Sequence, residues 1–258
     1  MGRRARQDPG RPGARRTGGR GGRRPRSLHR RAHRQAEGLA VLIVERVLAA
    51  DELQRVRSAV EQATFVDGKI TAQGSAREVK RNREAAPDDA TLAELRQRLK
   101  QLIGANSQVA TYARPTRWSP LIVSRYAEGE TYGEHVDAPF MRADDGAEMR
   151  ADLSFTLFLD DPASYEGGEL VLDSHRRPQP VKLPAGSLVI YPTSVLHAVA
   201  PVRSGVRHAV VGWFESRLRS AEQRLMLYEF EQSVAALPHD ANRRRLTLVF
   251  ASLLKMWS

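Results

Sequence analysis

Cysteine is absent from this chain of 258 residues. Without thiols the chain can form neither a disulfide framework nor a thiolate metal site, so a bound metal ion would need histidine and carboxylate ligands. Long apolar runs are also missing, because the best candidate, Leu39–Val44, is much shorter than the ~18 residues that a membrane-spanning helix requires. We therefore expect a cytoplasmic protein without a membrane partner, whose hydrophobic content of 41% suffices for a folded core.

Negative charge is scarce near the N-terminus. Residues 1–39 carry 13 arginines, no lysine and two acidic residues, a net charge of +11, whereas the rest of the chain holds 28 basic and 28 acidic residues. The balanced remainder gives no reason to expect a specific nucleic-acid partner. Residues 1–38 have too little apolar surface to offset the entropy of ordering, which predicts a disordered tail rich in Arg, Gly and Pro. Three interpretations stay open: a tail without a dedicated role or from a misassigned start, a segment that binds polyanions non-specifically, and a targeting peptide.

Helical periodicity marks both ends of the remaining chain. Apolar residues at helical spacing predict helices over 51–63, 89–105, 219–236 and 241–257, whereas 65–88 fits no pattern. We expect one domain over 39–217 and a C-terminal helical extension over 218–258. This C-terminal pair would pack on its own domain or form the interface of a homo-oligomer.

Short strands dominate the middle of the chain, from Leu121 to about Glu215. Apolar residues at 153, 155, 157 and 159 alternate with Ser154, Thr156 and Phe158, as in a strand. Turns rich in Gly and Pro separate further predicted strands over 121–123, 169–172, 181–183, 187–191, 197–202 and 207–214. Many short strands at this spacing predict a sandwich or jelly roll.

The stretch from Arg125 to Asp137 contains the first candidate metal ligands. It is predicted to re-enter extended structure at His135 after a turn at Gly129. Because side chains at i and i+2 leave a strand on the same face, His135 and Asp137 would project side by side while Val136 points away. An imidazole and a carboxylate on one face supply two members of a 2-His-1-carboxylate triad, the usual cage of non-haem Fe(II).

The third ligand is sought among the other histidines. Four of them lie in the tail, a polar turn or an interhelix loop and are set aside: His29, His33, His175 and His239. His197 opens a late strand, and Arg207 follows ten residues later, within reach of a short hairpin. Neighbours on a strand point to opposite sides, so we expect His197 as the ligand, Arg207 facing the cavity and His208 outside.

Several motifs around these residues resemble one known family. They are Thr131-Tyr-Gly-Glu-His-Val-Asp137, Asp152-Leu-Ser-Phe-Thr-Leu-Phe-Leu159, Gly167-Gly-Glu-Leu170, Leu183-Pro-Ala-Gly186, and Tyr191-Pro-Thr-Ser-Val-Leu-His197 with Arg207. Over about residues 40–258 the chain resembles the bacterial PKHD-type hydroxylases, Fe(II)- and 2-oxoglutarate-dependent dioxygenases related to prolyl 4-hydroxylases. The resemblance implies a mainly β fold: a double-stranded β-helix (jelly-roll) core with N-terminal helices packed on it and a C-terminal helical pair.

The resemblance also implies the site and its chemistry. His135, Asp137 and His197 would hold Fe(II), and Arg207 would pair with the distal carboxylate of 2-oxoglutarate. The enzyme would use O2, with ascorbate as a reductant, to hydroxylate an unactivated C–H bond and release succinate and CO2. A prolyl or other amino-acid side chain is the expected substrate, in a peptide or a small molecule, although the loop 139–150 carries no decodable specificity.

One position departs from relatives of this kind. Prolyl hydroxylase relatives of the animal type often have a tyrosine at about the place of Phe158, where it assists at the distal carboxylate, and Phe158 has no hydroxyl. Tyr126 and Thr156 are alternative donors between which the sequence does not choose. Tyr132 and Trp213 are interpreted as packing residues.

Two other functions stay open beside the hydroxylase. One is a non-catalytic jelly-roll protein that senses a metal or a 2-oxoacid. The other is a polyanion-binding protein, which only the arginine-rich tail favours.

Overall fold

The computed structural model describes residues 1–2, 40–72, 74–174 and 177–258. The predicted disordered tail therefore lies outside the described residues, as does His175. Everything described below belongs to the unit Arg31–Ser258.

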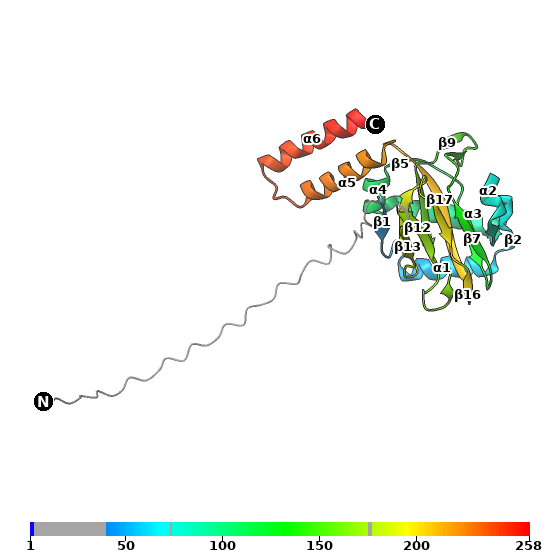
Figure 1. Cartoon of the computed structure of the whole chain (residues 1–258). Helices are drawn as coiled ribbons and strands as arrows, with labels where there is room; N and C mark the ends of the chain where they lie inside the picture. Colours follow the sequence, from blue (N-terminus) through cyan, green and yellow to red (C-terminus); the bar gives the residue numbers. More distant parts are fainter. Residues whose placement is uncertain (3–39, 73, 175–176) are drawn as a thin grey trace. The chain divides into compact units, whose positions relative to one another are not determined.

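Two antiparallel sheets form the body of this unit (Figure 1). The strands of the larger sheet are β1 (Leu42–Val44), β2 (Phe65–Asp67), β4 (Arg83–Ala85), β5 (Pro115–Trp118), β6 (Ile122–Tyr126), β10 (Leu153–Phe158), β14 (Leu188–Pro192) and β17 (Arg207–Ser216). They pair in the order β1-β14-β10-β17-β6-β4-β2, and β5 pairs with β17.

The smaller sheet faces the same interior. Its strands are β3 (Lys80–Arg81), β7 (Thr131–His135), β12 (Leu170–Ser174), β13 (Arg177–Val181) and β15 (His197–Val199), in the order β13-β12-β15-β7-β3. Two short pairs lie beside the sheets: β8 (Phe140–Arg142) with β9 (Glu148–Arg150), and β11 (Glu166–Gly167) with β16 (Val202–Ser204).

The chain winds alternately through the two sheets. From β6 in the larger sheet it passes to β7 in the smaller, returns to β10, crosses to β12 and β13, returns to β14, and repeats this with β15 and β17. This winding is that of a double-stranded β-helix, so the predicted fold class is confirmed.

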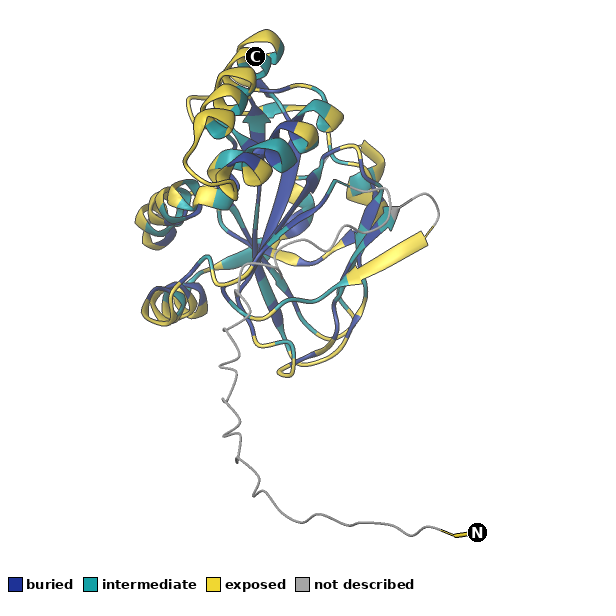
Figure 2. Ribbon diagram, turned by 90° about the vertical axis from the view of Figure 1, so that its left-hand side faces the viewer, coloured by how far each residue is buried: buried dark blue, intermediate teal, exposed yellow. Residues whose placement is uncertain are grey.

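Strand β10 lies between the two larger of the three apolar clusters. Leu153, Phe155 and Leu157 belong to the large apolar cluster that includes helix residues, whereas Phe158 belongs to a second cluster with residues of β12 and β14. Because side chains alternate along a strand, Ser154 and Thr156 share the face of Phe158, toward the interior between the sheets. Figure 2 shows these central strands as the buried part of the unit.

Helices cover the outer face of the larger sheet, except α2 (Gly74–Glu78), which contacts β7 of the smaller sheet. The N-terminal helices are α1 (Ala50–Gln62), α2 (Gly74–Glu78), α3 (Ala90–Ala105) and α4 (Ser107–Ala113), with a 3-10 turn over Gly68–Ile70. Asp89 starts α3 by accepting a hydrogen bond from the Thr91 amide, and Asn106 starts α4 by accepting from two amides. Leu92 and Leu99 of α3 are fully buried, as expected for apolar residues at helical spacing.

The C-terminal pair consists of α5 (Ala221–Ala235) and α6 (Ala241–Trp257). Helix α5 packs on α4, where Tyr228 meets Tyr112 edge to face with ring centroids 5.4 Å apart. Helix α6 packs on α5 and has no buried residue. The predicted homo-oligomer through these helices and the boundary near 217 stay predictions.

Some strand predictions were wrong in their bounds. The predicted strand 197–202 breaks into β15 and β16 around Pro201, which has no amide hydrogen for a sheet. The strand expected over 181–183 instead ends at Val181, and the loop 139–150 contains the β8–β9 hairpin. Among the described residues no helix is both long and apolar enough to cross a membrane.

Candidate functional site

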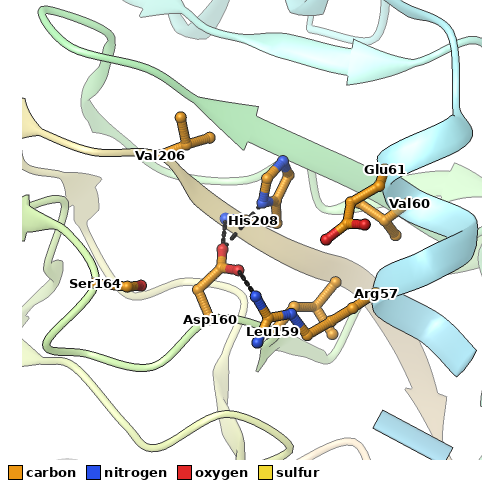
Figure 3. A pocket seen from close by; sticks show the side chains of 8 residues that line it. All are labelled: Arg57, Val60, Glu61, Leu159, Asp160, Ser164, Val206 and His208. Carbon is orange, nitrogen blue, oxygen red and sulfur yellow. Dashed lines mark hydrogen bonds and ion pairs between the residues drawn. The ribbon is translucent and has the colours of Figure 1, made fainter. Parts of the chain in front are cut away.

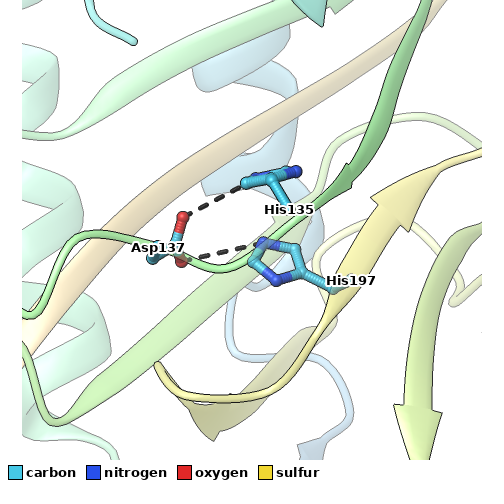
Figure 4. A group of neighbouring side chains, drawn as sticks. All are labelled: His135, Asp137 and His197. Carbon is cyan, nitrogen blue, oxygen red and sulfur yellow. Dashed lines mark ion pairs between the residues drawn. The ribbon is translucent and has the colours of Figure 1, made fainter. Parts of the chain in front are cut away.

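Three candidate ligands meet between β7 and β15 (Figure 4). His135 is the last residue of β7 and His197 the first of β15, and the two are direct partners in the strand register. The sequence predicts that His135 and Asp137 share one strand. Asp137 instead lies two residues beyond the end of β7. Its carboxylate nevertheless points toward both imidazoles, and Val136 is exposed.

The donor atoms of this triad are close enough to share one ion. One donor atom from each residue lies within 4.8 Å of the other two. Nε2 of His135 is 3.7 Å from Oδ1 of Asp137, and Nε2 of His197 is 3.7 Å from Oδ2. Among the described residues no other group of three potential ligands comes together in this way.

Both imidazoles are oriented by the backbone behind them. Nδ1 of His135 is 2.8 Å from the Gly133 carbonyl oxygen, and Nδ1 of His197 is 2.9 Å from the Val195 carbonyl oxygen. A carbonyl oxygen has no proton to give, so each Nδ1 must carry the hydrogen and donate it. The lone pair is then on Nε2, which is the atom that faces the other ligands.

Asp137 is held by two donors on one of its oxygens. Oδ2 accepts a hydrogen bond from the Ser154 hydroxyl at 2.7 Å and from the Trp213 indole at 2.9 Å. The interpretation of Trp213 as a packing residue was therefore incomplete. The sequence offered no signal for this contact, because Trp213 is 76 residues from Asp137 and meets it only after β17 pairs with β10.

The surroundings keep His135 neutral. Burial lowers its pKa to about 4, and the neighbouring His197 adds to the effect. The Tyr132 ring stacks on His135 with ring centroids 3.7 Å apart and an angle of 16° between the planes. A neutral imidazole at pH 7 has the lone pair that a metal ion requires.

Arg207 is a buried cation at the start of β17, as the sequence predicts from strand alternation. Its side chain is 1% exposed, its Nε has no hydrogen-bond partner, and among the described residues it forms no salt bridge. The guanidinium carbon lies 5.2 Å from the Tyr126 ring centroid and 5.4 Å from that of Phe158. A permanent charge buried without a counter-ion is costly, so this position fits an anionic ligand such as the distal carboxylate of 2-oxoglutarate.

Tyr191 connects the arginine to the triad. Burial raises the pKa of its hydroxyl, Asp137 raises it further, and Arg207 acts in the opposite direction, so the phenol is within electrostatic reach of both. The Thr156 side chain is a hydrogen-bonding neighbour of the Tyr191 hydroxyl, and the Tyr191 and His197 ring centroids are 5.2 Å apart.

Two neighbouring phenols, those of Tyr126 and Tyr165, are candidates for a second contact to an anion bound at Arg207. Thr156 is engaged by Tyr191, whereas Tyr126 lies opposite Arg207 in the strand register. Arg207 also donates to Tyr165, a residue that the sequence did not single out. The other candidate histidines lie away from the triad: His208 contacts Asp160, and His239 is exposed beside Arg243.

Comparisons with known proteins agree with this geometry. A sequence profile of the 2OG-Fe(II) oxygenase superfamily matches residues 121–215. A PKHD-type hydroxylase of Hyphomonas neptunium is 40% identical over 223 residues, which are 84% of this chain and 99% of that protein. A PKHD-type hydroxylase of Maricaulis maris is 41% identical and covers 83% of this chain and 97% of its own length.

Solved structures share the fold at low sequence identity. A 2OG-Fe(II) oxygenase family oxidoreductase of Burkholderia pseudomallei matches with a TM-score of 0.50 and 16% identity, over 70% of this chain and 86% of that one. A Trichoplax adhaerens prolyl hydroxylase, solved with a peptide fragment of a hypoxia-inducible factor, matches with a TM-score of 0.50 and 17% identity, over 74% and 88%. This chain belongs to the PKHD-type hydroxylases of the 2OG-Fe(II) oxygenase superfamily and is an Fe(II)- and 2-oxoglutarate-dependent dioxygenase.

Proposed function

We propose that this dioxygenase hydroxylates a prolyl or other amino-acid side chain, with His135, Asp137 and His197 as the Fe(II) ligands and Arg207 as the 2-oxoglutarate partner. One observation carries the assignment of residues: three convergent donors lie in the same interior as a buried arginine without a counter-ion. A three-ligand face leaves open positions for a chelating 2-oxoacid.

Each residue has a distinct part in this proposal. Bound Fe(II), 2-oxoglutarate and O2 supply the oxidation itself, with succinate and CO2 as products. The two imidazoles bind through Nε2 because their Nδ1 hydrogens are engaged by the backbone. Ser154 and Trp213 fix the Asp137 carboxylate, and Arg207 fixes the far end of the cosubstrate. His135, His197 and Arg207 are buried between the sheets, where such polar contacts are stronger than in water.

The substrate class rests on the relatives. The matched proteins are named hydroxylases, and the fold is shared with a prolyl hydroxylase that was solved with a peptide. Ascorbate as the reductant stays a prediction. A cytoplasmic location also stays a prediction. We expect the substrate as the partner of this site, without a specific nucleic acid or a membrane.

A spectroscopic titration tests the metal and cosubstrate site. Anaerobic protein with Fe(II) and 2-oxoglutarate is expected to give a weak visible charge-transfer band. His197→Ala should abolish the band, because a face of two ligands no longer holds the ion in this geometry. His239→Ala changes an exposed histidine of the α5–α6 loop and should leave the band unchanged. A full-strength band in His197→Ala would contradict the assignment.

Product formation tests catalysis and substrate class together. Succinate release would be screened against prolyl peptides, other peptides and siderophore-like small molecules. Stimulation by a peptide whose mass then increases by one oxygen supports the proposal. A normal charge-transfer band without substrate-stimulated succinate release by any of them would favour the non-catalytic sensor instead.

A further inference from the structure

A second polar cluster lies beside Arg207, on the side of β17 that faces α1 (Figure 3). Oδ2 of Asp160 accepts hydrogen bonds from both the backbone amide of His208, at 2.5 Å, and Nδ1 of its ring, at 3.0 Å. Oδ1 of the same carboxylate is 3.8 Å from an Arg57 nitrogen. We call the Asp160–His208 pair the strand clasp.

The strand clasp occupies the place where regular pairing between β10 and β17 ends. The last register pair is Phe158 with Ala209, and the Leu159 amide still donates to the His208 carbonyl at 3.2 Å. Beyond this point the chain leaves β10 for the loop that carries Tyr165. Asp160 is 7% exposed, and a buried carboxylate is retained at low cost only where it is paired. The clasp therefore fixes the first residues of β17 to the end of β10.

Arg207 is bonded directly to the residue that the clasp holds. Its side chain lies in a narrow space: a Cβ added to Gly168 would come 3.1 Å from the Arg207 Cδ, and the Tyr126 and Phe158 rings flank the guanidinium. A planar fork grips a carboxylate in two parallel hydrogen bonds only within a small range of positions. A shift of the His208 peptide would move the fork away from that range.

We propose that Asp160 and His208 are positioning residues that set the Arg207 guanidinium for the distal carboxylate of 2-oxoglutarate. This inference rests on the proposed role of Arg207. Neither residue of the clasp touches the metal triad, so their effect should be confined to one end of the cosubstrate. The alternative is a purely structural role, in which the clasp stabilises the fold without affecting the position of the Arg207 side chain.

The surroundings of the clasp make it suited to substitution. A cavity of about 240 Å³ adjoins it, lined by residues of α1, of the loop after β10 and of the start of β17. Truncating His208 enlarges this existing cavity and does not create a sealed void, so the cost in stability is moderate. Glu61 lines the same cavity from α1, which makes Glu61→Ala a matched control.

The experiment compares two ligands on Fe(II)-loaded protein without oxygen. 2-Oxoglutarate and 2-oxobutyrate share the 2-oxoacid end that binds the metal, but 2-oxobutyrate has no distal carboxylate. Titration of the charge-transfer band gives a Kd for each. Asp160→Ala is expected to raise the Kd of 2-oxoglutarate about tenfold, leave that of 2-oxobutyrate within about twofold, and restore the full band at saturation. His208→Ala keeps the backbone bond to Asp160 and should give a smaller rise, of about threefold.

Conservative and combined variants sharpen the result. Asp160→Asn keeps an oxygen that can accept from the His208 amide, so it should recover most of the affinity. The double variant Asp160→Ala/His208→Ala should bind 2-oxoglutarate no more weakly than Asp160→Ala, because loss of Asp160 alone already removes both hydrogen bonds of the clasp. If Asp160→Ala fails to fold, Asp160→Asn and His208→Ala provide the same comparison at smaller amplitude.

Two outcomes overturn the inference. One is an unchanged Kd for 2-oxoglutarate in both Asp160→Ala and His208→Ala. The other is an equal rise for both ligands together with weaker Mn(II) binding, which would make the clasp purely structural. The failure of the proposed function is distinguishable, because then wild-type protein would give no charge-transfer band or Arg207→Ala would bind 2-oxoglutarate normally.

Discussion

Arg207 and Asp137 are the two charged residues whose surroundings define the candidate site. Arg207 is buried without an ion-pair partner among the described residues, and Asp137 has one oxygen fully engaged by Ser154 and Trp213. An unpaired buried cation destabilises a free protein unless a ligand compensates it. The free protein therefore retains the unfavourable free energy of a buried charge at Arg207, and an anionic cosubstrate compensates that charge when it binds.

Arg207→Ala is expected to weaken the binding of 2-oxoglutarate far more than the binding of the metal ion. Loss of a buried bidentate pair costs about 3 kcal/mol, or roughly 100-fold in affinity. Calorimetric or spectroscopic titration would give the Kd of 2-oxoglutarate, and Mn(II) binding measured by paramagnetic resonance should change by less than about threefold. Arg203→Ala removes an exposed arginine nearby and serves as the control. Equal losses for both ligands would mean that Arg207 maintains the fold and not the cosubstrate.

Trp213→Phe is expected to loosen the metal centre while preserving the core. The change removes the indole donor that lies 2.9 Å from Asp137 but keeps an aromatic ring. Loss of such a supporting hydrogen bond typically lowers metal affinity about tenfold. Mn(II) titration measures the effect, with Trp118→Phe as the control because Trp118 packs against Phe155 and Phe214 without contacting Asp137. Unchanged metal affinity would reduce Trp213 to the packing role that the sequence suggests.

The sequence could predict the identity of the main polar residues but not their supports. His135, Asp137, His197 and Arg207 stand in short motifs with fixed spacing, which makes them visible without coordinates. Ser154 and Trp213 become neighbours of Asp137 only through the register of β10 and β17, and a single sequence does not give that register. Tyr165, in the loop after β10, was missed because the contact of this loop with Arg207 forms only in the folded chain.

At the scale of elements, the turn before β12 brings the backbone close to Arg207. Gly167 and Gly168 both have positive φ, at 73° and 65°, a conformation that favours glycine. The sequence marks this pair as a turn, and the structure adds that Gly168 leaves room for the arginine side chain.

Gly168→Ala is expected to disturb both the turn and the cosubstrate site. The new methyl would meet Arg207, Val202 and Tyr165 at about 3 Å, in addition to backbone strain of about 1–2 kcal/mol. Gly129→Ala provides a matched control, since Gly129 has a φ of 79° and nothing within 4 Å of an added Cβ. The midpoint temperature of thermal unfolding should fall in both variants, whereas the affinity for 2-oxoglutarate should fall only in Gly168→Ala. Equal affinity for 2-oxoglutarate in the two variants would show that the Arg207 side chain accommodates the new methyl group without any effect on cosubstrate binding.

Elements with clear periodicity were predicted well, including short strands such as β10 and β14, whereas the elements within residues 65–88 were not. The four predicted helices correspond to α1, α3, α5 and α6, because each has a repeated apolar stripe. Residues 65–88 fold as two short strands on one sheet, one on the other, a 3-10 turn and a five-residue helix, and none is long enough to show a period. Lys80 and Glu84 there form an ion pair at 2.5 Å, which explains how the charged Lys80 side chain can be buried.

At the scale of the whole chain, charge is divided unevenly along the sequence. Residues 1–39 hold a net charge of +11, and the remainder is balanced. The overall pI of about 10.6 therefore describes the tail and not the catalytic unit. Affinity for polyanions and oxygenase chemistry should be separable by truncation.

Deletion of residues 1–38 is expected to abolish binding to heparin at low salt and to leave 2-oxoglutarate affinity unchanged. Binding by the full chain should weaken steeply with salt, because each neutralised anionic group releases counter-ions. Retention on a heparin column at increasing NaCl concentration measures both forms. A truncated protein that still elutes late would place a polyanion site on the balanced part of the chain.

The direct pairing of His135 with His197 has a dynamic consequence. A metal ion held by both rings would lock together two strand ends that are 62 positions apart in the sequence, at a bulge where the backbone ladder between them is irregular. Amide hydrogens of β7 and β15 should then exchange with deuterated water more slowly in Mn(II)-loaded protein, while those of α6 exchange at the same rate in both forms.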